Sequence, residues 1–328
     1  MLRKHISKLG LCCRSDYPIK PIVPQINYTA SATTTLKNME AVKSMKDLGY
    51  AFNSDGQLRK IGPDGKPSEE PFQFNISDQH QECQAHYEEL GSAITEHIYS
   101  LLETKYNLVR LPVPVGSTPA TGTFIFASKD YNHKDVLLVL INGSGAVRAG
   151  QWARSLIINE NLEQGTQIPY IERAIAKGYG VMILNTNDNY QADGKKIPHS
   201  SSAEEHAYYV WETYISKAKA TSVVIVAHSY GGVVTVSLAD QLKSEFEKRV
   251  KAIAFTDSVH AFSPIKMPTF MKEITRNWIS SSAPLDTPMK TPEFDCPRVS
   301  AGHPRHEMSS CSCIESAFKF VEEKLTNK

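Results

Sequence analysis

The sequence predicts an α/β fold in which a mostly parallel sheet is covered by helices on both faces. Short apolar segments alternate with helix-like segments through much of the chain, a pattern typical of parallel strands joined by crossover helices. The apolar runs at residues 136–141 and 222–227 are continuous, as expected for strands that are buried on both faces. Ser229 follows the second run and precedes a helix-like segment, so its hydroxyl is expected at the carboxyl edge of the sheet.

Length and composition favour one large domain. The chain has 328 residues and a mass of 36.5 kDa, and its 41% hydrophobic and 22% charged residues exclude a disordered protein. Lysine and arginine total 36 against 35 aspartate and glutamate residues. With a formal charge of +1 we expect no broad basic face and no direct sequence-specific binding of nucleic acid. No apolar run approaches the roughly 20 residues of a membrane-spanning helix, so we expect no membrane span.

Domain boundaries follow from local composition. Residues 1–47 include a stretch rich in Pro, Thr and Ser, which predicts a disordered or extended N-terminal tail. Turn signals and periodic segments then begin, and the predicted domain covers residues 48–322. Residues 323–328 are expected to form a short C-terminal tail.

The first elements of the domain are a hairpin, a long helix and two strands. Asp55-Gly56 predicts a tight hairpin turn, and Asp64-Gly65 predicts a second turn. Residues 80–104 carry apolar side chains at spacings of three and four, which predicts an amphipathic helix. Short apolar strands are expected at 108–113 and 123–127.

The following elements alternate between strand and helix. Strands are predicted at 136–141, 179–184, 222–227, 251–256, 277–281 and 298–301. One helix is predicted from the glycine loop to about residue 158, and a second helix should end at Gly178. Two more are predicted over 204–219 and directly after Ser229. The crossovers between parallel strands should be right-handed.

The most specific motif is Ala227-His-Ser-Tyr-Gly-Gly232. A serine between a buried strand and a helix, with small neighbours, matches the nucleophile elbow of α/β-hydrolases. The sharp turn leaves no room for bulk, and Gly231 satisfies this requirement, whereas Ala227 replaces the usual first glycine. The alternative is a glycine-rich turn in which Ser229 caps the helix. We therefore predict an α/β-hydrolase-like fold with Ser229 as a candidate nucleophile.

A nucleophilic serine needs donors for the oxyanion of its tetrahedral intermediate. In this fold one donor is the backbone N–H after the nucleophile, here Tyr230, and the other comes from an earlier strand-to-helix loop. Asn142-Gly-Ser-Gly145 follows the strand at 136–141 and resembles the His-Gly-x-Gly loop of esterases, with Asn in the place of His. We predict an oxyanion hole made by Ser144, Gly145 and Tyr230, and an ordinary glycine turn is the alternative.

The general base should be a histidine beyond the last strand, because the chain order in this fold is Ser, acid, His. His303 and His306 both follow the strand at 298–301. We favour His306, because Pro304 restricts the backbone of His303 to extended conformations. A solvated loop histidine without a catalytic role is the alternative.

Two aspartates are candidates for the acid. Asp257 directly follows the strand at 251–256, and Asp286 follows the next strand after a loop. Both lie between Ser229 and the histidines in the sequence, and both could instead stabilise turns. We favour Asp257 and keep Asp286 as the alternative acid, because no long loop separates Asp257 from its strand.

No motif in the sequence calls for a metal or a cofactor. The six cysteines lack the even pairing of a disulfide framework, and Cys311-Ser-Cys313 is one residue too tight for the usual zinc pair. The stretch Asn185 to Asn189 is rich in Asn and Asp but lacks the spacing and glycine of a calcium loop. If the predicted site at Ser229 is active, the expected substrate is a small acyl compound.

Several segments of the chain resemble one known family, the argonaute-binding-protein-two domain family. The similarity extends from about residue 48 to residue 322, and the chain resembles a shorter paralogue of the cotranscriptional-regulator type in the animal branch of that family. The segments that carry the resemblance are 141–154, 226–232, 256–260 and 297–302, together with His306-Glu307.

The resemblance implies an α/β-hydrolase-like fold with Ser229 as a candidate nucleophile. It also implies roles in small-RNA-guided heterochromatin formation and in alternative splicing, through contacts with argonaute-type and chromatin proteins, in the nucleus and the cytoplasm. Two departures stand out: relatives often carry a lysine-rich insert where this chain has only residues 191–202, and they have a histidine where this chain has Asn142.

Overall fold

The computed structural model describes residues 43–326, so residues 1–42 of the tail predicted over 1–47 lie outside it. The described chain opens with a small antiparallel hairpin, in which β1 (Tyr50–Phe52) pairs with β2 (Leu58–Lys60). Asp55-Gly56 forms the connecting turn, and Gly56 has the positive φ of 71° that this turn needs. The hairpin prediction is therefore confirmed.

An eight-stranded sheet forms the centre of the domain, in the order β10-β9-β8-β7-β5-β6-β4-β3. Strand β4 runs antiparallel to both of its neighbours, and the other pairs in the sheet are parallel. Counted from its first strand the order is 1-2-4-3-5-6-7-8, which is the topology of an α/β-hydrolase-like sheet. The strands are β3 (Leu108–Val113), β4 (Thr123–Ser128), β5 (Val136–Ile141), β6 (Gly180–Ile183), β7 (Ser222–His228), β8 (Val250–Thr256), β9 (Thr275–Ile279) and β10 (Arg298–Ser300).

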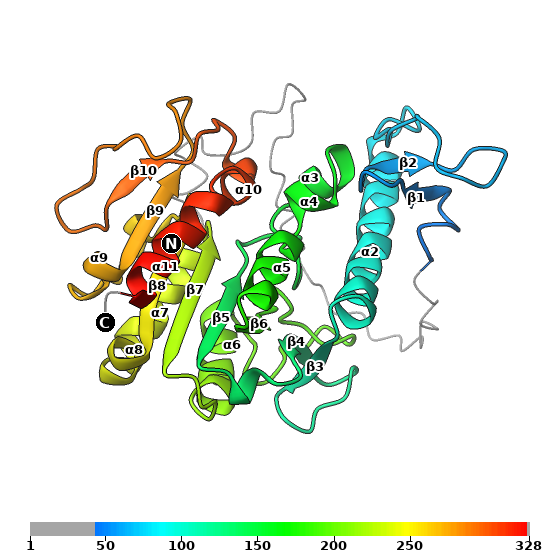
Figure 1. Cartoon of the computed structure of the whole chain (residues 1–328). Helices are drawn as coiled ribbons and strands as arrows, with labels where there is room; N and C mark the ends of the chain where they lie inside the picture. The colour runs from blue at the N-terminus through cyan, green and yellow to red at the C-terminus, as the bar shows by residue number, and fades with distance from the viewer. Residues whose placement is uncertain (1–42, 327–328) are drawn as a thin grey trace.

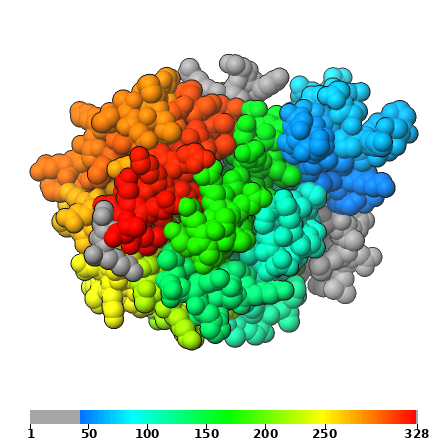
Figure 2. Space-filling model, in the orientation of Figure 1, coloured from blue at the N-terminus to red at the C-terminus, as the bar shows by residue number. Residues whose placement is uncertain are grey.

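Helices cover both faces of the sheet (Figure 1). One face carries α2 (His80–Thr104), α3 (Arg154–Asn159), α5 (Ile168–Ala176) and α11 (Ile314–Thr326). The space-filling view shows α11, α5 and α2 side by side on this face (Figure 2). The opposite face carries α6 (Ala203–Val210), the π-helical turn η2 (Trp211–Ile215), α7 (Gly231–Leu242), α8 (Ser244–Arg249) and α9 (Met271–Ile274). Shorter elements are η1 (Tyr131–His133), α4 (Leu162–Gly165), η3 (His260–Phe262), η4 (His306–Met308) and α10 (Ser309–Ser312).

The continuous apolar strands divide their side chains between two hydrophobic cores. Leu138 and Val224 point to the core under α2, α5 and α11, whereas Leu137 and Val223 point to the core under α6 and α7. Successive side chains on a strand face opposite sides, so a strand with helices on both faces must be apolar at every position. Full burial of one such side chain contributes about 1.5–3 kcal/mol to the stability of the fold. The two cores therefore fix the central strands and the positions of their carboxyl ends.

Three elements differ from the sequence-based expectation. The segment after the glycine loop is not a helix until Arg154, so Arg148, Gln151 and Trp152 lie in an extended loop. The helix expected over 204–219 ends at Val210 and continues as a π-helical turn. The last helix, α11, continues to Thr326, beyond the boundary at residue 322 that the composition suggested. Among residues 43–326, no helix is long and apolar enough to cross a membrane.

Candidate active site

Ser229 occupies a sharp turn between β7 and α7. Its φ is +53°, a left-handed conformation that non-glycine residues adopt rarely and that stores strain. Three backbone hydrogen bonds hold it there: its N–H donates to the carbonyl of Thr256 at 3.1 Å, and its own carbonyl accepts from the N–H groups of Gly232 and Val259, each at 3.2 Å. The turn therefore has the geometry of a nucleophile elbow.

Small neighbours make this turn sterically feasible. A Cβ on Gly231 would lie 2.6 Å from the carbonyl oxygen of Ile141, which is closer than real Cβ atoms approach backbone. A Cβ on Gly143 would lie 3.0 Å from the Cβ of Ser229, so the glycine loop after β5 packs directly against the elbow. Ala227, in the place of the usual first glycine, is fully buried in β7.

His306 and Asp257 form a hydrogen-bonded pair beside this turn. Asp257 follows β8 and His306 begins η4 after β10, and Nδ1 of His306 lies 2.7 Å from Oδ2 of Asp257. Burial alone would lower the pKa of His306, but the hydrogen bond and charge of Asp257, with the charge of Glu307, raise it above its ordinary value. Burial alone would raise the pKa of Asp257, but its contacts with His306 and Ser280 lower it.

The imidazole of His306 also contacts the residue before the serine. The rings of His228 and His306 have centroids 4.7 Å apart, and His228 Nδ1 lies 2.8 Å from the Thr256 carbonyl. Within the described chain no hydrogen bond joins Ser229 Oγ to His306. In unliganded active sites such bonds are often long and shorten when substrate binds. The structure thus brings Ser229, His306 and Asp257 to one edge, and their catalytic role stays a prediction.

The alternative acid and the alternative base lie in other contacts. Asp286 accepts hydrogen bonds from Nε1 of Trp278 at 2.8 Å and from Oγ of Ser316 at 2.6 Å. His303 Nδ1 accepts from the backbone N–H of Arg305 at 3.1 Å. The geometry therefore pairs the favoured base with the favoured acid and gives Asp286 a structural role.

The glycine loop presents its backbone at the elbow. Ser144 and Gly145 are exposed, and within the described chain no hydrogen bond is donated by their backbone N–H groups. Gly145 has φ +118°, which other residues rarely adopt. Asn142 turns inward: it is 1% exposed and its Nδ2 donates to the carbonyl of Gly143 at 2.9 Å. Tyr230, the other predicted donor, begins α7 as its N-cap residue.

Asn187 anchors this loop, a role that the sequence did not reveal. Its Nδ2 donates to the carbonyl of Gly143 at 2.8 Å and to that of Val147 at 3.1 Å. Asn185 supports the same loop by accepting the N–H of Ala149 at 3.0 Å. The one signal for it in the sequence is the density of Asn residues after the strand at 179–184.

A buried histidine lies behind these asparagines. His206 Nε2 accepts the backbone N–H of Asn185 at 3.1 Å, and its Nδ1 lies 2.9 Å from Ser200 Oγ. Because Nε2 accepts, Nδ1 carries the proton and donates to Ser200. Burial lowers the pKa of His206 to about 3, and burial together with the nearby His306 lowers that of His228 to about 3. Both imidazoles are therefore neutral in the folded protein near neutral pH.

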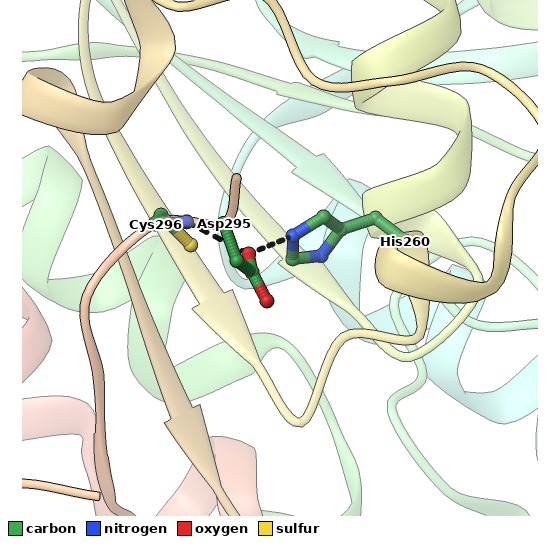
Figure 3. Close-up of side chains that lie close together, drawn as sticks. All are labelled: His260, Asp295 and Cys296. Carbon is green, nitrogen blue, oxygen red and sulfur yellow. Dashed lines mark hydrogen bonds and ion pairs between the residues drawn. The ribbon is translucent and has the colours of Figure 1, made fainter. Parts of the chain in front are cut away.

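His260, Asp295 and Cys296 form a second polar cluster (Figure 3). His260 Nε2 lies 2.7 Å from Asp295 Oδ1, and the backbone N–H of Cys296 donates to the same oxygen at 2.7 Å. Possible metal-ligand atoms of these three residues lie within 4.8 Å of one another. However, Arg298 donates from Nε to Asp295 Oδ2 at 2.8 Å, and burial raises the pKa of the Cys296 thiol. A guanidinium already neutralises the carboxylate, so hydrogen bonding accounts for this cluster without a cation.

One hollow on the described surface lies away from these groups. It has a volume of about 600 Å³ between the end of α7, α8 and the segment around α9, with the exposed Phe294 at its rim. None of Ser229, His306 and Asp257 lines it. It therefore contributes nothing to the chemistry of the elbow.

Comparison with known proteins gives one family for most of the chain. The Arb2 domain model matches residues 42–196 and 191–285. The chain is 40% identical to the cotranscriptional regulator ARB2A homolog of Xenopus tropicalis, with 88% of this chain and 82% of that protein covered. It is 41% identical to human cotranscriptional regulator ARB2A, with 85% and 80% covered. The similarity thus spans both proteins over most of their length.

Solved structures show similarity in fold alone. A histone deacetylase from Saccharomyces cerevisiae superposes with a TM-score of 0.50 at 12% sequence identity, over 71% of this chain and 97% of that one. At this identity the match supports the layered α/β architecture and says nothing about the reaction.

Proposed function

This chain belongs to the Arb2 domain family, and on that premise we propose that it is a cotranscriptional regulator that acts through contacts with other proteins. The observation that carries this proposal is the 40% identity to a cotranscriptional regulator over 88% of the chain. The partners we propose are argonaute-type and chromatin proteins. The processes are small-RNA-guided heterochromatin formation and chromatin-linked alternative splicing, in the nucleus and the cytoplasm. The balanced charge of +1 favours protein partners over direct nucleic-acid binding.

Affinity capture tests this function. The tagged full-length chain should retain argonaute-type and chromatin proteins from a nuclear extract. A buried-core variant such as Trp211→Ala, which should unfold, serves as the control for nonspecific capture, because Trp211 is fully buried. Equal capture by the folded and unfolded chains, or capture of neither class of partner, would contradict the proposal.

A second function, hydrolysis of an ester, thioester or amide, is favoured by the geometry at the elbow. The specific observation is a strained Ser229 beside a His306–Asp257 pair with an N–O distance of 2.7 Å. Because Nδ1 of His306 donates to Asp257, Nε2 carries the lone pair and is the nitrogen that can accept a proton. Asp257 would hold the ring in that tautomer and stabilise the imidazolium that forms.

The reaction would proceed through an acyl-enzyme. Ser229 Oγ attacks the acyl carbon while His306 Nε2 takes the hydroxyl proton, and the carbonyl oxygen becomes an oxyanion near the N–H groups of Tyr230, Ser144 and Gly145. The intermediate expels the alcohol, thiol or amine, which receives the proton from His306. Water then attacks the acyl-serine with His306 again as base, releasing the acid and restoring Ser229.

The two functions are separable by one substitution. Ser229→Ala removes the nucleophile and leaves the surface almost unchanged, so partner capture should persist if the site and the contacts are independent. Loss of partners in folded Ser229→Ala would instead link the site to the regulatory contacts. Turnover of a short-chain thioester or ester by wild type, abolished in Ser229→Ala, would support the hydrolase, whereas equal turnover by both would contradict it.

A further inference from the structure

One short turn holds both the candidate acid and the backbone of the candidate nucleophile. Residues 257–259 follow β8, and Asp257 has a positive φ of 50°. The side chain of Asp257 binds His306, and two residues later the N–H of Val259 donates to the carbonyl of Ser229. A shift of this turn would therefore move the acid and weaken one of the backbone hydrogen bonds that hold Ser229.

Buried polar groups hold this turn. The amide of Asn277 on β9 accepts the N–H of Ser258 at 3.1 Å and donates to its carbonyl at 3.3 Å. Ser258 Oγ lies 2.8 Å from Nδ1 of His260 and accepts the N–H of His260 at 3.3 Å. Asn277 is fully buried and Ser258 is 8% exposed, so water cannot easily replace these bonds.

His260 is fixed in turn by a carboxylate from a distant loop. Its Nε2 donates to Asp295 Oδ1 at 2.7 Å (Figure 3). The residue lies 3% exposed against the ring of Phe255, with ring centroids 4.8 Å apart. Nδ1 of His260 lies 2.8 Å from Ser258 Oγ, so the ring connects the carboxylate of Asp295 to the hydroxyl of Ser258. Arg298 binds the other oxygen of Asp295 and keeps the carboxylate in place.

Ser258, His260 and Asp295 do not form a second hydrolase site. Ser258 Oγ packs against the first turn of α7, where a Cβ on Gly232 would lie 1.7 Å from it. An acyl group therefore has no space to reach this hydroxyl. The linear series Asp295–His260–Ser258 instead ends on the backbone of the turn that carries Asp257.

We propose that His260 and Asp295 are positioning residues that hold the 257–259 turn, and through it the relative placement of Asp257, His306 and Ser229. This inference rests on the hydrolase site proposed above. The network acts on the site in the way that second-layer hydrogen bonds orient catalytic side chains in general. It connects residues 35 positions apart in the sequence at the edge where the candidate acid lies.

The test measures the titration of the His306 imidazole by NMR in histidine-labelled full-length protein. His306 faces Asp257, Glu307 and the ring of His228, and Asp257→Asn gives the reference value for a broken pair. His260→Leu should shift the pKa of His306 most of the way to that reference, and Ser258→Ala should give part of the shift. His260→Gln, which keeps a donor toward Asp295, should restore a value near wild type. Thr275→Val is the matched control, because Thr275 is buried on β9 and its hydroxyl has no partner.

A purely structural role for His260 would lower stability and leave the His306 titration of the folded protein unchanged. Wild-type titration in folded His260→Leu and Ser258→Ala would overturn the proposal. If His260→Leu does not fold, Ser258→Ala decides the matter, since it removes one hydroxyl and leaves the rest of the network. The readout does not depend on Ser229 reacting, so an inactive wild type would contradict the hydrolase and leave the positioning result intact.

Discussion

Acid should destabilise this protein through His206. Its Nε2 accepts the backbone N–H of Asn185, and its fully buried ring has a pKa of about 3 instead of 6.5. The unfolded chain binds a proton at this residue below pH 6.5, and the folded chain does not until about pH 3. The stability that the neutral ring of His206 contributes is therefore fully present above pH 6.5 and is lost as the pH falls toward 3.

The magnitude follows from the two pKa values. At pH 5, about 1.5 units below the unfolded-state pKa of 6.5, protonation of His206 in the unfolded chain lowers the free energy of unfolding by about 2 kcal/mol. The result changes little for any folded-state pKa below about 4. Substituting His206→Gln removes the titration, so the loss of unfolding free energy between pH 8 and pH 5 should be about 2 kcal/mol smaller than in wild type.

Urea denaturation followed by tryptophan fluorescence at pH 8, 6.5 and 5 measures this difference. The glutamine variant should be less stable than wild type at pH 8, because Ser200 loses a partner, and the two curves should converge in acid. His199→Asn in the same loop is the control: the side chain is exposed and Asn tolerates its φ of 61°. A pH dependence in His206→Gln equal to that of wild type would refute the reasoning.

Further predictions concern the elbow and its partners. Asp257→Asn should slow fluorophosphonate labelling of Ser229 by about 10²-fold or more, and Asp286→Asn should leave the rate within about 2-fold; the reverse order would show that the acid is misassigned. Labelling of wild type should rise with pH through a midpoint above 6.5, because the raised pKa keeps His306 protonated to higher pH, and a midpoint below 6.5 would contradict the pairing. Gly231→Ala should cost roughly 1–3 kcal/mol in thermal denaturation, since its Cβ would meet the Ile141 carbonyl; Gly62→Ala, whose Cβ would come closest to the flexible Asp64 side chain, at 3.2 Å, should cost less. Asn187→Ala should leave the fold intact and slow labelling about 10-fold or more by loosening the glycine loop, and an unchanged rate would separate this loop from the site.

Local patterns were sufficient for the parts of the fold that depend on neighbouring residues. The apolar runs at 136–141 and 222–227 predicted β5 and β7 because strands buried on both faces have no polar positions. The spacing of apolar residues over 80–104 predicted α2 to its end residues. Chain order limited the acid to Asp257 or Asp286 and the base to a histidine after the last strand. The short path from β8 then favoured Asp257, and the restriction that Pro304 places on its neighbour favoured His306.

Hydrogen bonds between loops could not be predicted in the same way. Asn187 binds the carbonyl of Gly143, 44 positions earlier, and its path depends on where the loop after β6 folds back. Asp295 reaches His260 from a loop between β9 and β10 that has no periodic pattern. The prediction of a helix directly after the glycine loop was wrong, because that segment first forms backbone hydrogen bonds with the turn at residues 165–167. The N–H of Gln167 donates to the carbonyl of Gly150, and the N–H of Trp152 donates to the carbonyl of Gly165.

The most direct test of the proposed chemistry is labelling of the folded full-length chain with a fluorophosphonate probe at pH 8, which reports an activated serine without knowledge of the substrate. The account predicts labelling of wild type that is lost in Ser229→Ala and reduced about 10³-fold or more in His306→Ala, because the hydroxyl of Ser229 needs a base to accept its proton. Circular dichroism on the same samples confirms folding. Well-folded wild type that does not label, or labelling that persists in Ser229→Ala, would contradict the assignment of Ser229 as the nucleophile.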